Sequence, residues 1–334
     1  MTGMTELFAI RFSRLLTSLI PFGGMRRRCR KLLRYRLQFP PGRDESFARA
    51  SFRSSVRYVQ DVPRMVSLPT SETPLVSVII PVFNNYALTM RCLASLAEHS
   101  DNLPVEVILA DDASTDETRH IQNCVEGLRV VRTPGNLRFL RNCNHAASHA
   151  RGKYVLFLNN DTQVQDGWLR TLVATLEGDA SIGLVGSMLL NPDLTVQECG
   201  MRMARDGVAT SLGGGCPTPW RPAFRGIRDV DYVSGASIML TMSLWNELGG
   251  FDELFAPAYY EDSDLAYRVR ACGLRVVCQP ASIVIHCCGA SSAGGNSGQK
   301  ASFEKNRLLF VRRWCVAPQG NRSGKDVSQG RHGL

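Results

Sequence analysis

Short apolar runs alternate with amphipathic stretches along most of the chain, beginning near residue 75. Short runs rich in β-branched and large apolar residues predict strands covered on both faces of a sheet. Apolar positions at helical spacing predict helices that pack against that sheet. The predicted strands are residues 76–80, 105–110, 128–132, 154–158 and 182–188. The helices predicted between them are residues 86–99, 117–125, 140–150 and 168–176.

The later part of the chain is less regular. A strand is predicted at residues 231–241, with an interruption at Gly235 where backbone can approach a ligand closely. Residues 191–228 are rich in Gly, Pro and Arg and predict a long irregular surface segment, and the Gly/Ser-rich residues 289–300 predict a mobile lid. The remaining predictions are helices at 243–248, 261–272 and 301–314, and strands at 275–278 and 282–285.

Strands and helices that alternate with short connections indicate an α/β fold with a mostly parallel central sheet and helices on both faces, in the Rossmann-like manner. No G-x-G-x-x-G follows the first strand and no G-x-x-x-x-G-K-[ST] occurs, so a dinucleotide-binding site and a P-loop are both disfavoured. In open α/β sheets, ligands bind at the carboxyl ends of the strands. The candidate chemistry is therefore expected at that edge.

The N-terminal residues differ from this pattern. Residues 7–20 carry an apolar face at helical spacing, and a basic run follows at 26–36. The apolar stretch is shorter than the roughly 20 residues that cross a bilayer, and a signal peptide would have its basic residues first. Residues 7–36 therefore predict an amphipathic helix on an anionic membrane surface. The alternative is a helix packed on the body with solvated arginines. Residues 38–73 resemble a linker.

The net charge of +9 belongs to this arm. Residues 1–73 contain 14 Lys and Arg against 5 Asp and Glu, whereas the rest of the chain contains 25 of each. The high pI therefore gives no support for nucleic acid as a partner. The 11 cysteines are odd in number and form no C-x-x-C pair, and Cys287 and Cys288 are adjacent. This usage predicts a reduced, cytosolic compartment.

Polar side chains collect where the predicted strands end. Asp161 closes the sequence Asn-Asn-Asp after the strand at 154–158, and a carboxylate flanked by amides and Thr162 suits a hard divalent cation. The same three residues also favour an ordinary turn, so this pattern alone leaves both interpretations open. The residues collected in this way are Asn84, Asp111, Asn136, Asn142, Asp161, Asp262 and His286.

Eight segments in this order resemble glycosyltransferase family 2, with the GT-A nucleotide-diphosphosugar fold, and the rhamnosyltransferase and galactofuranosyltransferase types in particular. They cover roughly residues 75–315. The resemblance implies a GT-A domain at 74–315, with a nucleotide-binding half at 74–175 and an acceptor and catalytic half at 176–315. The basic arm and linker at 1–73 precede it, and a disordered tail at 316–334 follows. The segments are VSVIIPVFN, VILADDASTDET, NLRFLRNCN, YVLFLNNDT, DYVSGA, GGFDE, YYEDSDLAYRVRACG and VIHCCGAS.

The same resemblance implies roles for individual residues. Asp262 is similar to the general base, and Asp111 to the acid that contacts the nucleobase. Asp161 resembles the last acid of the metal-binding DxD motif, and His286 a further ligand of the same Mg²⁺ or Mn²⁺. The other expected donor contacts are Pro81, Phe83, Asn84, Asn136, Asn142 and Asn160, and the expected acceptor or sugar contacts are Gly235 and Glu261.

Two positions depart from the family pattern. Asn159 replaces the first acid of the DxD motif, and Arg138 stands where family members commonly have glycine. Ordinary roles also remain open elsewhere: Asp111 as a helix cap, the acids from Glu261 on as first-turn residues favoured by the helix dipole, and His286 as a structural side chain.

The predicted function is an inverting, metal-assisted transfer of a hexose or deoxyhexose. The sugar moves from a nucleotide diphosphosugar to a hydroxyl of a polysaccharide or a lipid-linked glycan, in cell envelope biosynthesis. The expected location is cytoplasmic, peripheral at the inner face of the cell membrane. The alternatives are a catalytically impaired nucleotide-binding scaffold at the membrane and a nucleotidyltransferase of similar fold.

Overall fold

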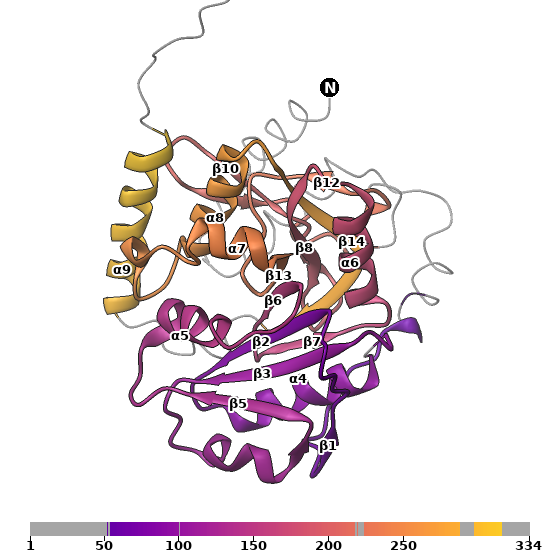
Figure 1. The fold of residues 1–334 in the computed structure, drawn as a ribbon. Coiled ribbons are helices and arrows are strands. Elements are labelled where there is room, and N and C mark those ends of the chain that lie inside the picture. Colours follow the sequence, from indigo (N-terminus) through magenta and orange to yellow (C-terminus); the bar gives the residue numbers. More distant parts are fainter. Residues whose placement is uncertain are drawn as a thin grey trace, which may run out of the picture.

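A ten-stranded mixed sheet runs through the centre of the molecule, in the computed structural model shown in Figure 1. The structure describes residues 52–315 apart from 53, 100, 218, 220–223 and 288–296. The predicted membrane-binding stretch at 7–36, the tail at 316–334 and most of the predicted lid lie outside the described residues. The predicted lid's last residues, from 297 on, are helical.

The described residues up to 178 follow the predicted order of elements closely. The predicted helix at 117–125 is instead a 3₁₀ helix that ends at Asn123, because the chain then forms a short strand. The helices and strands here are β1 Val66–Ser67, β2 Val76–Val82, α4 Tyr86–Glu98, β3 Val105–Asp111, η1 Glu117–Asn123, β4 Val125–Glu126, β5 Leu128–Arg132, α5 Arg138–Ala147, β6 Tyr154–Leu158, β7 Thr162–Val164 and α6 Trp168–Gly178.

The later half departs more from the sequence pattern. Residues 231–236 are not strand, and the predicted irregular segment at 191–228 contains short strands. The two strands predicted at 275–278 and 282–285 are one strand with an irregular register between Gln279 and Ile283. The elements here are β8 Ile182–Leu190, β9 Val196–Glu198, β10 Met201–Met203, β11 Ala209–Ser211, β12 Arg228–Asp229, β13 Ser237–Thr241, α7 Met242–Leu248, η3 Glu253–Phe255, α8 Glu261–Ala271, β14 Arg275–His286, α9 Ser297–Phe310 and η4 Val311–Cys315.

The strand order in the sheet is β12-β14-β8-β13-β6-β2-β3-β5. Strands β6, β2, β3 and β5 are parallel, as are β8 and β14. Between these two groups lies β13, which is antiparallel to both β6 and β8. The sheet is therefore mixed, and one reversed strand joins its two parallel parts.

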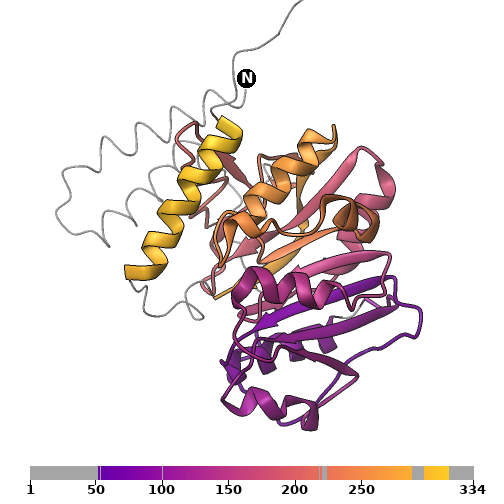
Figure 2. The same ribbon diagram turned by 60° about the vertical axis from the view of Figure 1, so that its left-hand side comes forward.

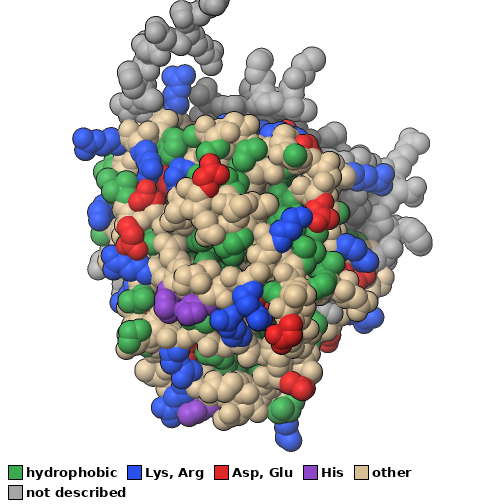
Figure 3. All heavy atoms as spheres, in the orientation of Figure 1, with side chains coloured by type: hydrophobic (Ala, Val, Ile, Leu, Met, Phe, Trp, Pro, Cys, Tyr) green, Lys and Arg blue, Asp and Glu red, His purple; other side chains and the backbone are tan. Residues whose placement is uncertain are grey.

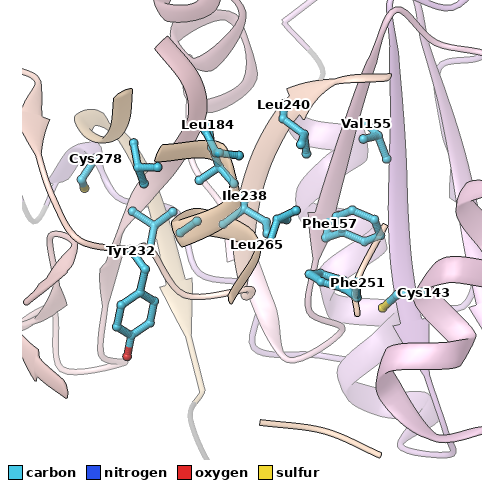
Figure 4. Packing of buried hydrophobic residues seen from close by; sticks show 14 of the residues in the cluster. Cys143, Val155, Phe157, Leu184, Tyr232, Ile238, Leu240, Phe251, Leu265 and Cys278 are labelled. Carbon is cyan, nitrogen blue, oxygen red and sulfur yellow. The ribbon is translucent and has the colours of Figure 1, made fainter. Parts of the chain in front are cut away.

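Helices cover both faces of the sheet, as expected for an α/β fold. Side chains of α4 and α6 pack on one face, and those of α5, α7 and α8 pack on the other. Successive side chains of β6 point to opposite faces of the sheet. Phe157 therefore packs with α5, α7 and α8, and Leu156 packs with α4 and α6. Phe157 lies 5.1 Å from Phe251 and 4.7 Å from Trp245, ring centroid to centroid. Figure 4 shows Phe157 and Phe251 close together, with Cys143 of α5 near Phe251.

Helix α9 lies along the outside of the molecule, on the side of α8 (Figure 2). Asn306 of α9 is fully buried, and its amide nitrogen donates hydrogen bonds to the carbonyl oxygens of Phe255, Ala258 and Tyr259 at 2.7 to 3.0 Å. These bonds hold the loop that leads into α8. No described helix has the length and apolarity that a membrane crossing requires.

Candidate active site

A cleft of about 390 Å³ lies at the carboxyl ends of β2 and β6. Strand β13 contributes from its other end: because it is antiparallel, Ser237 pairs with Leu158 at the end of β6. The loop 234–236 therefore meets Asn159, whose N–H donates to the carbonyl oxygen of Ala236 at 3.0 Å. The predicted site residues that line the cleft are Pro81, Phe83, Asn136, Asn142, Asn160, Gly235, Glu261 and Asp262.

The acid pair Glu261 and Asp262 opens α8 on one side of the cleft. Asp262 Oδ2 accepts a hydrogen bond from the N–H of Gly235 at 3.0 Å, and Oδ1 accepts one from Ser263 at 2.6 Å. Burial raises the pKa of Asp262 above its usual range. Burial and then the charge of Asp262 raise the pKa of Glu261 to about 8. A pKa of about 8 favours the protonated form of Glu261 at neutral pH.

A third acid, Glu198 of β9, lies behind the loop 234–236. Its Oε1 accepts a hydrogen bond from the N–H of Ser234 at 3.1 Å, and the side chain is buried. Burial, assisted by the negative charge of Asp262, raises the pKa of Glu198 to about 7. Consecutive amides of this loop, Ser234 and Gly235, are thus held by two different carboxylates. The loop is fixed as one wall of the cleft.

Asp161 and His286 meet beside the cleft, although 125 positions separate them in the chain. The antiparallel pair of β7 and β14 sets Thr162 opposite His286, which brings the imidazole next to the preceding residue. Nε2 of His286 lies 3.2 Å from Oδ1 of Asp161, and both side chains are buried. The two side chains are therefore in direct contact, and their predicted role as ligands of one metal ion stays a prediction.

The hydrogen bonds of Gln197 define the state of this histidine. The carbonyl oxygen of His286 can only accept, so the amide nitrogen of Gln197 faces it at 3.2 Å. Gln197 Oε1 then faces Nδ1 of the ring at 2.7 Å, and Nδ1 carries a proton. In the neutral ring, Nε2 presents a lone pair to the Asp161 carboxylate. Two acceptors at this separation require a shared cation, either a proton or a metal ion.

The donor set fits a divalent metal ion that the substrate helps to bind. Asn159 Oδ1 is buried and accepts no hydrogen bond from the described residues. The described side chains of His, Cys, Asp and Glu form no group of three that would hold a metal alone. Mg²⁺ commonly takes one or two carboxylates and completes its shell with water and substrate phosphates. Asp161, His286 and Asn159 suit such a partial site, and the Nδ1 hydrogen bond of His286 is the usual support of a ligating histidine.

Two predicted donor contacts lie behind the cleft. Asp111 is fully buried: its Oδ2 accepts from Arg132 Nε at 2.7 Å and its Oδ1 from the N–H of Ser114 at 2.9 Å. Asn84 Oδ1 accepts from the N–H of Thr115 at 2.8 Å. Both side chains join neighbouring loops and do not line the cleft. Their predicted contacts with a nucleotide stay predictions.

Several residues that the sequence did not predict belong to the cleft or its support, among them Asp112, Ser234 and Glu198. Asp112 lines the cleft, and its Oδ1 accepts from the N–H of Leu137 at 2.6 Å. Its position directly after Asp111 was the available signal. The segment that contains Glu198 gave no signal, since it reads as irregular. Among the predicted residues, Asn142 Oδ1 is buried and accepts no hydrogen bond from the described residues, so it remains available to a ligand.

The arrangement of strands and helices is that of the GT-A fold, and comparison with solved structures supports this assignment. The structure of GalNAc-T7 with UDP, GalNAc and Mn²⁺ aligns with a TM-score of 0.54 and 18% identity, over 64% of this chain and 44% of that one. TarS 1-349 of S. aureus with UDP-GlcNAc aligns with a TM-score of 0.50 and 20% identity, over 71% and 65%.

Sequence comparison names the family. The family model described as Glycosyl transferase family 2 matches residues 77–198, so the chain carries a glycosyltransferase family 2 domain. The O-antigen biosynthesis protein RfbC of Myxococcus xanthus is 32% identical over 72% of this chain, which spans only 20% of that relative. An N-acetylglucosaminyl-diphospho-decaprenol L-rhamnosyltransferase of Mycobacterium tuberculosis is 29% identical over 66% of this chain and 78% of the relative.

Proposed function

We propose that this glycosyltransferase moves a hexose or deoxyhexose from a nucleotide diphosphosugar to a hydroxyl of a polysaccharide or lipid-linked glycan, with inversion at the anomeric carbon. The observation that carries this proposal is the cleft itself. One side presents a half-buried carboxylate of raised pKa, Asp262, and the other presents Asn159 beside the Asp161–His286 pair. The first side suits the attacking hydroxyl of the acceptor, and the second suits the leaving diphosphate of the donor.

In this mechanism Asp262 accepts the proton of the acceptor hydroxyl while the hydroxyl oxygen attacks the anomeric carbon of the donor sugar. The new C–O bond forms as the bond to the diphosphate breaks, and the electron pair leaves with the nucleoside diphosphate. The two N–H bonds to Asp262 fix its carboxylate in place. Neutral Glu261 adds no second negative charge that would repel the donor. Asn142 and Asn160 line the cleft and offer polar contacts to the donor.

A divalent cation, Mg²⁺ or Mn²⁺, would be held by Asp161 and His286 with Asn159. When bound, it neutralises the charge of the leaving diphosphate. Names of the relatives support the choice of donor and acceptor, since they include an L-rhamnosyltransferase with a lipid-diphosphate acceptor and an O-antigen biosynthesis protein. A cytoplasmic location, with residues 7–36 on the inner face of the cell membrane, belongs to the same proposal.

The test is product formation. Purified protein is incubated with a panel of nucleotide hexoses and deoxyhexoses, lipid-diphosphate glycan acceptors and Mn²⁺, and the product's anomeric configuration is determined. We expect one donor to give a product of inverted configuration, EDTA to abolish its formation and Mn²⁺ or Mg²⁺ to restore it. Donor binding without any product would favour a nucleotide-binding scaffold. Retained configuration, or unchanged activity in EDTA, would contradict the inverting, metal-assisted mechanism.

A further inference from the structure

Arg138 is a cation at the cleft that the proposed mechanism leaves unused. It is the first residue of α5, it lines the cleft and it is exposed. Nearby arginines are paired: Arg132 with Asp111 at 2.7 Å and Arg141 with Glu253 at 2.8 Å. The guanidinium of Arg138 has no ion pair or hydrogen bond with any described residue. It is also the one Lys or Arg in the described lining of the cleft.

The backbone at Arg138 adopts a conformation that glycine would adopt more easily. Its φ is 68°, in the left-handed region, which costs an L-residue roughly 1 to 2 kcal/mol. Two hydrogen bonds hold it there, from its N–H to Asp112 Oδ2 at 2.8 Å and to Asn136 Oδ1 at 3.1 Å. Fold stability alone therefore favours glycine here. The arginine side chain makes no hydrogen bond, ion pair or ring contact with the described residues that would offset the strain.

The charges that line the cleft indicate what the side chain of Arg138 binds. The lining contains the carboxylates of Asp112 and Asp262, so an anionic substrate needs positive charge from elsewhere. The proposed metal site carries less negative charge than two acids would give it, because Asn159 supplies a neutral oxygen, so its affinity for the cation is lower. A guanidinium presents a planar fork of N–H donors that matches phosphate oxygens in a bidentate manner. Arg138 lines the cleft from the start of α5.

We propose that Arg138 binds the diphosphate of the donor and stabilises the leaving nucleoside diphosphate as a second cation beside the metal. This inference rests on the proposed function, because it assigns a residue to that donor's diphosphate. It makes diphosphate recognition partly independent of the divalent ion.

The test compares Arg138→Gly and Arg138→Lys with the parent protein, and uses Arg141→Ala as a control on the same helix. The probes are UDP, GDP, ADP, CDP and dTDP with the matching nucleosides, measured by calorimetry in Mn²⁺ and again in EDTA. In EDTA the parent should prefer the diphosphate to its nucleoside. Arg138→Gly should lose about 10- to 100-fold in diphosphate affinity and nothing in nucleoside affinity. Arg138→Lys should fall between them, and Arg141→Ala should match the parent.

Melting temperature separates this role from a structural one. Arg138→Gly relieves the strained φ, so its melting temperature should equal or exceed that of the parent while diphosphate binding is lost. Equal diphosphate affinity in the parent and Arg138→Gly would overturn this inference and leave the proposed function intact. A parent protein that binds none of the diphosphates, in Mn²⁺ or EDTA, would overturn both.

Discussion

Asp262 and Asp264 lie two residues apart on α8, and their surroundings differ in kind. Asp262 lines the cleft, whereas Asp264 is fully buried behind it, 2.7 Å from Arg268 and 3.3 Å from Arg313. Trp314 also donates a hydrogen bond to Asp264 at 2.9 Å. These two carboxylates therefore form a matched pair for separating chemistry from stability.

Asp262→Asn keeps the shape of the side chain and removes its basic oxygen. Loss of a general base typically slows turnover by about 10² to 10⁴, so we expect a fall of this size at saturating donor and acceptor. Donor affinity and melting temperature should stay close to the parent's. Asp264→Asn should instead lower stability by about 1.5 to 3 kcal/mol, because it removes the charge of a buried carboxylate that accepts a hydrogen bond from Arg268, and its folded fraction should turn over normally. Normal turnover in Asp262→Asn would remove this residue from the mechanism.

The raised pKa of Glu261 predicts a pH dependence of stability. A carboxyl with a pKa near 4.3 in the unfolded chain and about 8 in the folded protein binds more protons when folded. Its contribution to stability is complete below pH 4 and is lost as pH rises towards 8. Urea unfolding measures the free energy of unfolding at each pH. Between pH 5 and 8 we expect this free energy to fall less in Glu261→Gln than in the parent. Glu198→Gln, which removes the other acid of high pKa, serves as the comparison.

If the free energy of unfolding changed with pH in the same way in the parent and in Glu261→Gln, Glu261 would be ionised in the folded protein at neutral pH. The negative charge that acts on Glu261 comes from Asp262 on the same helix, which also raises the pKa of Glu198 on β9. Acids with lowered pKa, such as Glu106 and Asp116, titrate below this window and act with the opposite sign.

At the residue scale, the sequence predicted the types of side chain at the site better than their positions. Asp111 and Asp112 are adjacent acids at the end of β3, and successive side chains of a strand point to opposite sides. A sequence pattern cannot tell which of the two lines the cleft. Glu198 was missed because its pKa depends on burial by elements distant in the chain. The contact of Asp161 with His286 depends likewise on the register of β7 and β14.

At the scale of elements, length decided what could be predicted. Strands β2, β3 and β6 are buried on both faces, and β5 is a partly buried edge strand. The predicted and observed bounds of all four agree within two residues. The three-residue strands β9, β10 and β11 are too short to show a period. Strand β14 was divided in two because Pro280 and the shifted register interrupt its apolar pattern.

Helix α9 is an element whose role can be tested through one side chain. Asn306→Ala removes the donor to three buried carbonyl groups, each costly to leave unpaired. We expect the melting temperature to fall by several degrees and the KM for donor to rise, because Ala258 and Tyr259 line the cleft. Circular dichroism and steady-state kinetics measure the two effects. Lys305→Ala changes the adjacent, exposed position and should alter neither value.

Loss of stability without any change in KM would confine Asn306 to a structural role remote from the cleft. An unchanged melting temperature would show instead that α9 contributes little to the loop that precedes α8.

At the scale of the whole molecule, charge divides the chain. On the face shown in Figure 3, acidic and basic side chains of the described residues are interspersed. The excess of positive charge lies in residues 1–73. We expect a protein lacking residues 1–36 to lose binding to anionic vesicles in a flotation assay and to keep its melting temperature. Salt should weaken binding of the full chain, since exposed charges are screened beyond about 10 Å at 0.1 M.

A truncated protein that unfolds at a much lower temperature would show that the arm packs on the body. Neutral vesicles provide the control, because they lack the surface charge that attracts a polybasic segment.

The reversed strand β13 has a consequence for the order of events during synthesis. When the chain has been made as far as β8, both β6 and β8 expose the edge that β13 later occupies. Unpaired edges of this kind invite pairing with other chains. Arrival of residues 237–241 closes both edges together and sets the loop 234–236 beside the end of β6. One strand thus closes two aggregation-prone edges and places one wall of the cleft in the same step.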